Sequence, residues 1–187
     1  SQFYASSEWT FGYPAATGIG TQHGGILVDF NAVKGGIEII PLDNDWQKAA
    51  HVYSDEVLIS HRTDAEKGTP KFERGKSLSD YQCEMIYISG TAAIRGEESI
   101  VTGDVLVQTE ITLENIQHLI GLEEGREKLP EHSGKLELLR VYLKHEEDAK
   151  IVKEDMDKLC PDVPIVYLYA DVCREELLVE IEGIAYL

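Results

Sequence analysis

Residues 135–170, "KLELLRVYLKHEEDAKIVKEDMDKLCPDVPIVYLYA", decide the fold, because they predict a strand, a helix and a second strand in succession. The segments "KLELLRVYLK" and "VPIVYLYADV" are apolar and have the composition of strands. The segment "EEDAKIVKEDMDKL" between them is predicted to be a helix. A chain that alternates in this way packs its helices against a sheet.

The sequence on either side extends the same pattern. Before this unit, "CEMIYISG" is predicted to be a strand ending at Gly90, and Asp104 is predicted to be the N-cap of a helix. That helix, "VLVQTEITLENIQHLI", repeats apolar residues at spacings of three, four and seven. After the unit, "ELLVEIEGIAYL" is predicted to be the last strand. The order β-α-β-α-β-β predicts an α+β fold, with two helices on one face of a mixed sheet.

The remaining segments predict connections and a separate N-terminal part. "GEESIVTG" is predicted to be a turn-rich connection, and "EEGREKLPEHSG" and "RTDAEKGTP" are predicted to be loops. In residues 1–69, "GGILVDFNAV" and "GIEIIPL" predict two strands joined through "KGG" as a hairpin, and "DNDWQKAAHVY" predicts a short helix. We therefore divide the chain into a strand-rich segment, 1–69, and a domain, 70–187. Because no Met begins the chain, Ser1 is expected to lie inside a longer protein.

Composition narrows the classes of function. The chain has 187 residues, 43% of them hydrophobic, and a formal net charge of −17. Such a negative surface repels phosphate backbones, so we expect no nucleic-acid partner. No apolar run is long enough to span a bilayer, and the first residues show no basic stretch followed by an apolar one, the pattern of a signal peptide, so we expect no membrane association and a cytoplasmic location.

Cysteine and histidine spacing predicts neither a disulfide framework nor a metal site. The chain has three Cys, an odd number, without a C-x-x-C pair, which is typical of a reducing compartment. Its six His show no paired ligand spacing. We therefore expect no metal and no cofactor.

The glycine-rich stretch "ATGIGTQHGG" only partly resembles a nucleotide-binding loop. His23 stands where the third Gly of G-x-G-x-x-G belongs, and the following "GILVDF" predicts a strand where phosphate binding needs a helix. A turn explains the stretch better, although its backbone amides are still able to line a pocket.

The last strand places two carboxylates on one face. Glu180 and Glu182 are two residues apart, so they share one face while Val179 and Ile181 share the other. If the apolar face packs on the helices, the carboxylate face must meet solvent or another subunit. Two interpretations stay open: an ion-paired or solvated strand face, with Arg140 or Arg174 as the partner, and a functional site. Cys173, beside Arg174, is either a thiol with a lowered pKa or a small buried residue.

Four stretches together resemble one protein family. "YISGTAAIRG", "GDVLVQTEITLENIQHLI", "LRVYLKHEEDAKIV" and "LLVEIEGIA" follow in the order of the Rid/YjgF proteins, also called the L-PSP endoribonuclease family. The resemblance covers about residues 70–187. It implies a chorismate-mutase-like α+β domain, assembled as a trimer or pseudo-trimer with ligand pockets between subunits.

The resemblance carries the usual deaminase residues only in part. Glu180 matches the family glutamate that positions a water. Ile165, however, stands where deaminating members have the Arg that holds the substrate carboxylate, and Phe72 replaces a family Tyr. These departures weaken the prediction of an imine or enamine deaminase.

A second branch of the superfamily is similar in more places. "P-x-F-x-R" (Pro70 to Arg74), "SGTA-x-I-x-G" and "D-V-C-R-x-x-L-L-V-E" look like the chorismatases, which release the enolpyruvyl group of chorismate as pyruvate. Those longer enzymes join a degenerate N-terminal domain to a C-terminal one, and residues 1–69 would then be the end of the first. The resemblance implies Glu180 as the catalytic acid. The expected substrate-binding residues are Arg174, Arg74, Cys173, Gly90, Thr91 and Phe72.

The chemistry of these residues agrees with a small carboxylate metabolite as the partner. Arg74 and Arg174 are each able to grip a carboxylate at two points. Protonating an enol ether needs a carboxylic acid that is neutral near pH 7, and burial together with the charge of Glu182 would raise the pKa of Glu180. The alternatives are an imine or enamine deaminase and a ligand-binding trimer without turnover. The family label of endoribonuclease is disfavoured by the net charge.

Overall fold

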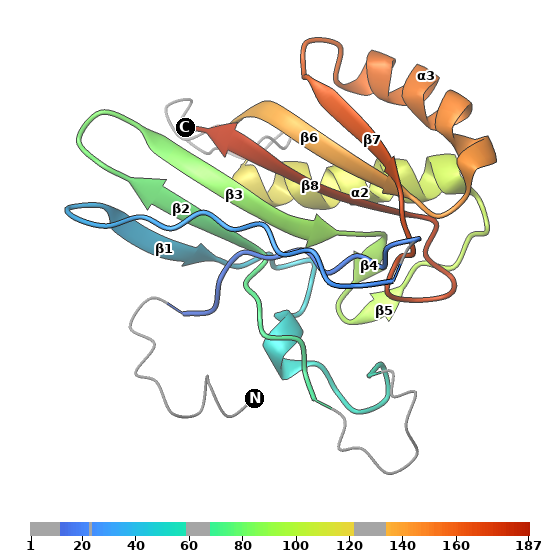
Figure 1. Ribbon diagram of the computed structural model, residues 1–187, viewed down its shortest axis with the longest axis horizontal. Coiled ribbons are helices and arrows are strands. Elements are labelled where there is room, and N and C mark those ends of the chain that lie inside the picture. Colours follow the sequence, from blue (N-terminus) through green and yellow to red (C-terminus); the bar gives the residue numbers. More distant parts are fainter. Residues whose placement is uncertain (1–11, 23, 59–67, 122–133) are drawn as a thin grey trace.

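A six-stranded mixed sheet is the centre of the computed structural model, which describes residues 12–22, 24–58, 68–121 and 134–187. The strand order is β1-β2-β3-β8-β6-β7, and every neighbouring pair is antiparallel except β6 and β7, which are parallel (Figure 1). The strands are β1 (Glu38–Leu42), β2 (Gly75–Ser79), β3 (Glu84–Thr91), β6 (Lys135–Leu143), β7 (Ile165–Tyr169) and β8 (Val179–Tyr186). The predicted α+β class is confirmed.

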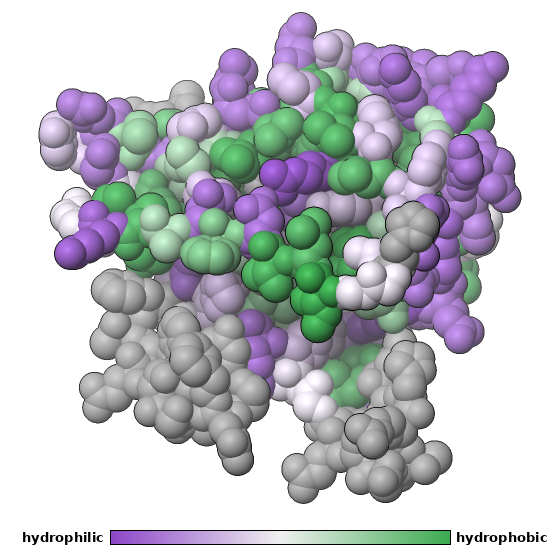
Figure 2. All heavy atoms as spheres, in the orientation of Figure 1, coloured by the Kyte–Doolittle hydropathy of each residue, from purple (hydrophilic) through white to green (hydrophobic). Residues whose placement is uncertain are grey.

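Two helices pack on the same side of this sheet. They are α2 (Val105–Ile120) and α3 (Ala149–Leu159), the latter entered through a 3-10 turn, η3 (Glu146–Asp148). One core cluster joins Ile116 of α2, Val152 and Met156 of α3, and Leu139 and Ile181 of the sheet. The helix α3 links the parallel strands β6 and β7, a connection that parallel neighbours require. Among the described residues, no helix lies against the opposite side of the sheet, which faces the viewer in Figure 1. Figure 2 shows hydrophilic residues among hydrophobic ones on that face.

The predicted ends of α2 are confirmed in detail. Asp104 is extended, and its side chain accepts hydrogen bonds from the amides of Leu106 and Val107. At the other end Gly121 adopts a left-handed conformation, with φ of 79°, and its amide bonds back to carbonyl groups of the last turn. Both are the residue types that helix ends favour.

Residues 24–33 do not form the predicted strand. In this chain they have no strand neighbour, and Ile26, Leu27, Val28 and Phe30 are 73–94% exposed. The expected hairpin is therefore wrong, and Glu38–Leu42 pairs with β2 instead. We did not predict β2, because "GKSLS" is short and polar; its neighbours β1 and β3 hold it in the sheet.

Two further segments differ from expectation. The short helix predicted over 43–53 is reduced to a 3-10 turn, η1 (Ala50–Val52). Asn44 explains the difference, because its side-chain oxygen accepts from the amide of Trp46 and its nitrogen donates to the carbonyl of Asn115, which favours a turn. The connection "GEESIVTG" begins within a two-stranded hairpin, β4 (Ile94–Arg95) and β5 (Glu98–Ser99).

Most of the predicted loop over 123–134 and most of the one over 62–70 lie outside the described residues. The division at residue 69 stays a prediction, and β1, which precedes it, pairs with β2, which follows it. Among the described residues, no helix is long and apolar enough to cross a membrane.

We expect Asp104→Ala to lower the free energy of unfolding by about 1 kcal/mol, because it leaves two amides at the start of α2 without their acceptor. Urea denaturation measures the change. The control Glu110→Ala alters an exposed position inside the same helix and should stay within about 0.5 kcal/mol of wild type. Equal effects of the two substitutions would contradict the capping role.

Candidate functional site

Glu180 lies on β8, on the face of the sheet opposite the helices. Its neighbours Val179 and Ile181 enter the core between sheet and helices, as the alternation along a strand requires. The Glu180 residue is nevertheless only 6% exposed. Its cover comes from this same chain rather than from solvent or another subunit, which corrects the expectation drawn from the sequence.

The cover is residues 12–21, which we call the N-terminal strap. The strap crosses the helix-free face of the sheet (Figure 1), and hydrogen bonds fix it along its length. The amide of Ala16 donates to Ser89 Oγ at 3.0 Å, and the amide of Gly90 donates to Thr17 Oγ1 at 2.8 Å. Gly20 and Asp171 exchange backbone hydrogen bonds at the far end. The stretch "ATGIG" thus lies over the site, where the sequence predicted a turn whose backbone amides are able to line a pocket.

Gly90 leaves room for the Glu180 carboxylate. A Cβ atom on Gly90 would lie 2.1 Å from Glu180 Oε1 and 2.7 Å from Thr17 Cγ2. No side chain fits at those distances without moving the carboxylate or the strap. The predicted closeness of Gly90 to the site therefore has a specific form: the backbone of β3 forms the floor beneath the carboxylate.

The second carboxylate, Glu182, has a different environment. Its Oε1 accepts a hydrogen bond from Arg140 Nη1 at 2.6 Å and from the Tyr142 hydroxyl at 2.8 Å, both on the neighbouring strand β6. This ion pair raises the pKa of Arg140, and burial followed by the bond to Glu182 raises the pKa of Tyr142. The ion-paired interpretation of the strand face is therefore correct for Glu182.

The pKa of Glu180 is raised to about 7. Burial is the largest cause, the negative charge of Glu182 is the second, and the positive charge of Arg74 opposes both. The two causes expected from the sequence are those found. A carboxyl group of this pKa holds its proton near neutral pH, which is what a general acid requires.

Arg74 lies just before β2, and its residue is 3% exposed. Its Nη2 donates to the carbonyl of Lys48 at 2.6 Å and to the Tyr53 hydroxyl, and its guanidinium lies 5.7 Å from the centre of the Phe72 ring. Its Nε is buried and has no hydrogen-bond partner within the described residues. A buried donor of a charged group without a partner is costly, so this atom is a candidate to bind an anionic ligand.

Arg174 is also buried, and it meets the same aromatic ring. Its Nη1 donates to the carbonyl of Glu97 and to Ser99 Oγ, both at 2.9 Å. The guanidinium carbons of Arg74 and Arg174 each lie 5.5 Å from the centre of the Tyr53 ring. The two arginines selected from the sequence are thus brought together at one ring. That ring belongs to Tyr53, which was not predicted from the sequence.

The other candidates fare differently. Thr91 is buried, and its hydroxyl donates to the carbonyl of Ser89. Cys173 is exposed as a residue, so the buried interpretation is wrong. The pKa of its thiol is raised, first because surrounding protein partly withdraws it from water and then because Glu180 is near, so the expected lowering by Arg174 is wrong as well. Ile165 packs against the core.

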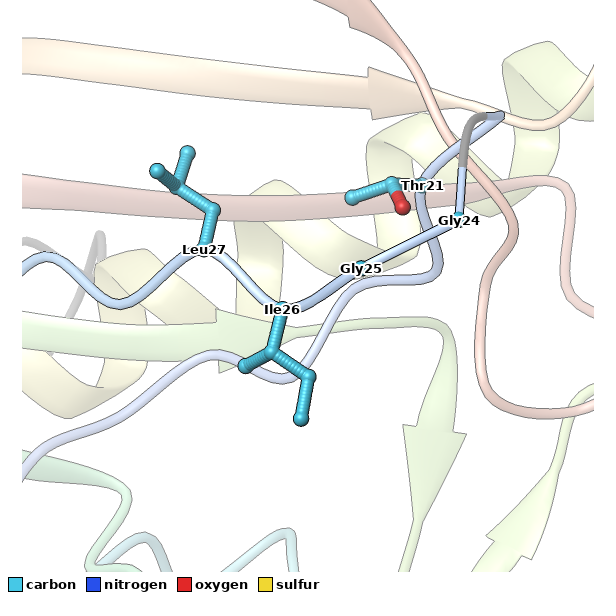
Figure 3. Close-up of a pocket in the computed structure, with 5 residues that line it drawn as sticks. All are labelled: Thr21, Gly24, Gly25, Ile26 and Leu27. Atoms are coloured by element: carbon cyan, nitrogen blue, oxygen red, sulfur yellow. The ribbon is translucent and has the colours of Figure 1, made fainter.

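An open pocket lies where the strap ends, lined by Thr21, Gly24, Gly25, Ile26 and Leu27 (Figure 3). The glycine-rich stretch therefore does line a pocket, but this pocket holds no titratable side chain. Among the described residues, no group of three or more His, Cys, Asp or Glu is placed to hold a metal ion. The chemistry available to the site is that of Glu180 and the two arginines.

Comparison with curated proteins gives two informative relatives, although no family model matches the chain. The chain is 35% identical over 179 residues to a chorismatase of Streptomyces rapamycinicus, covering 91% of this chain and 50% of that protein. It is 33% identical over 185 residues to a 3-hydroxybenzoate synthase of Streptomyces hygroscopicus, covering 92% and 50%. The chain therefore spans about half the length of the curated relatives it matches.

Solved structures give the same fold. A chorismatase crystal structure matches 80% of this chain and 44% of its own, with a TM-score of 0.64 and 30% identity. A putative endoribonuclease L-PSP from Entamoeba histolytica matches 80% of this chain and all of its own, with a TM-score of 0.53 and 12% identity, which shows the fold alone. The expected YjgF-like fold is confirmed.

We expect Glu180→Gln to change how stability depends on pH. Between the usual pKa of 4.5 and the folded value of about 7, the folded wild-type chain binds more protons than the unfolded chain. Its free energy of unfolding therefore falls as pH rises through this window, by on the order of 3 kcal/mol, and the variant lacks this loss. Urea denaturation from pH 4 to pH 8 should show the variant gaining relative stability. A constant difference between the two proteins would show that Glu180 titrates normally.

We also expect Gly90→Ala to lower the free energy of unfolding by about 1–3 kcal/mol, because the added methyl group must displace the Glu180 carboxylate or the strap. Gly36→Ala is the matched control, since its methyl group would meet no atom within 4 Å. The same urea titration compares them. If Gly90→Ala is as mild as the control, the close packing beneath Glu180 is not real.

Proposed function

We propose that this chain, which belongs to the chorismatase-like branch of the Rid/YjgF superfamily, carries the site of a hydrolase that releases the enolpyruvyl group of chorismate as pyruvate. The observation that supports this most directly is the buried Glu180 carboxyl group, whose pKa is raised to about 7. The names of the relatives, a chorismatase and a 3-hydroxybenzoate synthase, agree with chorismate as the substrate.

Glu180 is the proposed acid. It donates its proton to the methylene carbon of the enol ether, which places positive charge on the ether oxygen and the carbon beside it. Water adds to that carbon and gives one proton to Glu180, which forms a hemiketal. The hemiketal hydroxyl passes its proton to the ether oxygen as the bond between that oxygen and the carbon breaks. Pyruvate then leaves, and the ring keeps a hydroxyl group. The reaction consumes one water, and the acid is regenerated.

Arg74 and Arg174 are the proposed binding residues. Chorismate carries two carboxylates, and two buried guanidiniums gathered at one ring offer a partner for each. The unpartnered Nε of Arg74 supplies a donor that a carboxylate would satisfy. The Phe72 ring packs beside the Arg74 guanidinium, and Gly90, which has no side chain, leaves the space that the Glu180 carboxylate occupies. Cys173 and Thr91 remain proposed wall residues.

Two other functions, a deaminase and a ligand-binding protein, are less well supported than the hydrolase. An imine or enamine deaminase would need a carboxylate anchor other than Ile165, which packs against the core. A ligand-binding protein without turnover would use the same arginines and leave the acid idle. A trimer or pseudo-trimer, free of nucleic acid and located in the cytoplasm, remains the proposed setting, consistent with the net charge of −17.

Pyruvate release from chorismate tests the proposal, for this chain and for any longer natural protein that contains it. We expect Glu180→Gln to slow release about 10²–10⁴-fold, the usual contribution of a general acid. We expect the wild-type rate to fall as pH rises above about 7, where Glu180 loses its proton.

The control is Glu110→Gln, an exposed glutamate on α2, which should leave the rate unchanged. Pyruvate formation that is insensitive to Glu180→Gln would remove Glu180 from the mechanism. Absence of pyruvate from both proteins would reject the proposal, and imine substrates would be assayed next.

A further inference from the structure

The segment 48–54 precedes, in the sequence, the four stretches that carry the family resemblance, yet it reaches into the site. It contains the 3-10 turn η1 and ends in Tyr53 and Ser54. The Tyr53 ring is half-buried and stands 5.5 Å from each guanidinium carbon, so those two carbons are separated by no more than twice that distance. Tyr53 therefore touches both proposed binding residues.

Tyr53 contacts the two arginines in different ways. Its hydroxyl accepts a hydrogen bond from Arg74 Nη2, while its ring presents a π-face to which both cations are attracted. Two like charges repel each other when buried, and an electron-rich ring beside both offsets part of that repulsion. The ring is thus suited to hold two guanidiniums near each other before any anion binds.

The backbone on both sides of Tyr53 is fixed by an ion pair. Lys48 Nζ lies 2.8 Å from Glu97 Oε2, and the same oxygen accepts from the amide of Ser54 at 2.8 Å. These hydrogen bonds lower the pKa of Glu97 to about 2. Glu97 therefore stays charged at any ordinary pH and holds both ends of the 48–54 segment.

The same two residues receive the arginines through their carbonyl groups. Arg74 Nη2 donates to the carbonyl of Lys48 at 2.6 Å, and Arg174 Nη1 donates to the carbonyl of Glu97 at 2.9 Å. The backbones of the two segments are also linked, because the Lys48 amide donates to the carbonyl of Gly96 at 2.7 Å. The two carbonyl groups that the guanidiniums grip therefore lie on segments joined by both a backbone hydrogen bond and a side-chain ion pair. Lys48 and Glu97 thus form a frame around Tyr53. The Lys48 carbonyl holds Arg74, and the Glu97 carbonyl holds Arg174.

We propose that Tyr53 is a positioning residue that spaces the Arg74 and Arg174 guanidiniums, so that the site selects ligands with two carboxylates over ligands with one. The inference rests on the proposed function, since it concerns the same site. Arg174 bonds to Glu97 and Ser99 through Nη1, and the Nε of Arg74 has no partner among the described residues, so both guanidiniums have donor atoms to offer a ligand. A dicarboxylate meets both arginines at their preset spacing, whereas a monocarboxylate uses one of them.

Calorimetric binding at pH 7 tests this, with chorismate as the dicarboxylate and benzoate as the monocarboxylate. All proteins carry Glu180→Gln, so that the ligand is not consumed. We expect Tyr53→Leu to weaken chorismate binding about tenfold more than benzoate binding, because both guanidiniums lose their common support. Tyr53→Phe, which keeps the ring and loses only the hydroxyl, should lower the selectivity less, by about threefold. Tyr81→Leu, at a 92% exposed tyrosine, is the matched control and should change neither.

The outcomes separate the two proposals. Chorismate binding with unchanged selectivity in Tyr53→Leu overturns the role of Tyr53 and leaves the proposed function standing. If the protein that retains Glu180 binds chorismate but releases no pyruvate, the proposed hydrolase is overturned. The role of Tyr53 is then decided by the selectivity measurement alone. Equal losses for both ligands mean a merely structural Tyr53 and overturn the inference. If Tyr53→Leu does not fold, Tyr53→Phe decides: it should shift selectivity about threefold, and no shift overturns the inference.

Discussion

Glu180 keeps a proton near neutral pH because its carboxyl group is withdrawn from water while a second negative charge, on Glu182, stays close. Each condition depends on a different part of the chain. The strap and the bare backbone at Gly90 exclude water, and hydrogen bonds from Arg140 and Tyr142 hold the Glu182 carboxylate in place on the same strand. The pairing between β8 and β6 therefore fixes the position of the charge that raises the pKa of Glu180.

The position of Arg74 also affects the protonation of Glu180. Arg74 lowers the pKa of Glu180, so an arginine any closer would ionise the acid and remove its proton. Arg74 is instead held by two hydrogen bonds that its Nη2 donates, one to the Lys48 carbonyl and one to the Tyr53 hydroxyl. A bound carboxylate would neutralise Arg74 and raise the pKa of Glu180 further. Substrate binding and protonation of the acid would then reinforce each other, which is useful in an enzyme that must begin by giving up a proton.

Much of the framework follows from the sequence, because hydrophobic periodicity and helix caps act locally. The spacing in 105–120, with Asp104 ahead of it, was sufficient for α2, and the alternation in β8 identified both the core face and the carboxylate face. Contacts between distant segments were not predictable in this way. The strand β2 is polar and depends on its neighbours, 24–33 has the composition of a strand without a partner in this chain, and Tyr53 gave no local signal.

The site itself is built from both sides of the boundary suggested at residue 69. Residues after it supply the acid, the two arginines and the floor at Gly90. Residues before it supply the strap and the frame around Tyr53, which cover the acid and hold the arginines. The acid and the groups that keep it dry therefore come from different parts of the chain. A substitution in the strap or in the 48–54 segment is able to change the pKa of Glu180 or the placement of the arginines without altering the sheet that carries the acid.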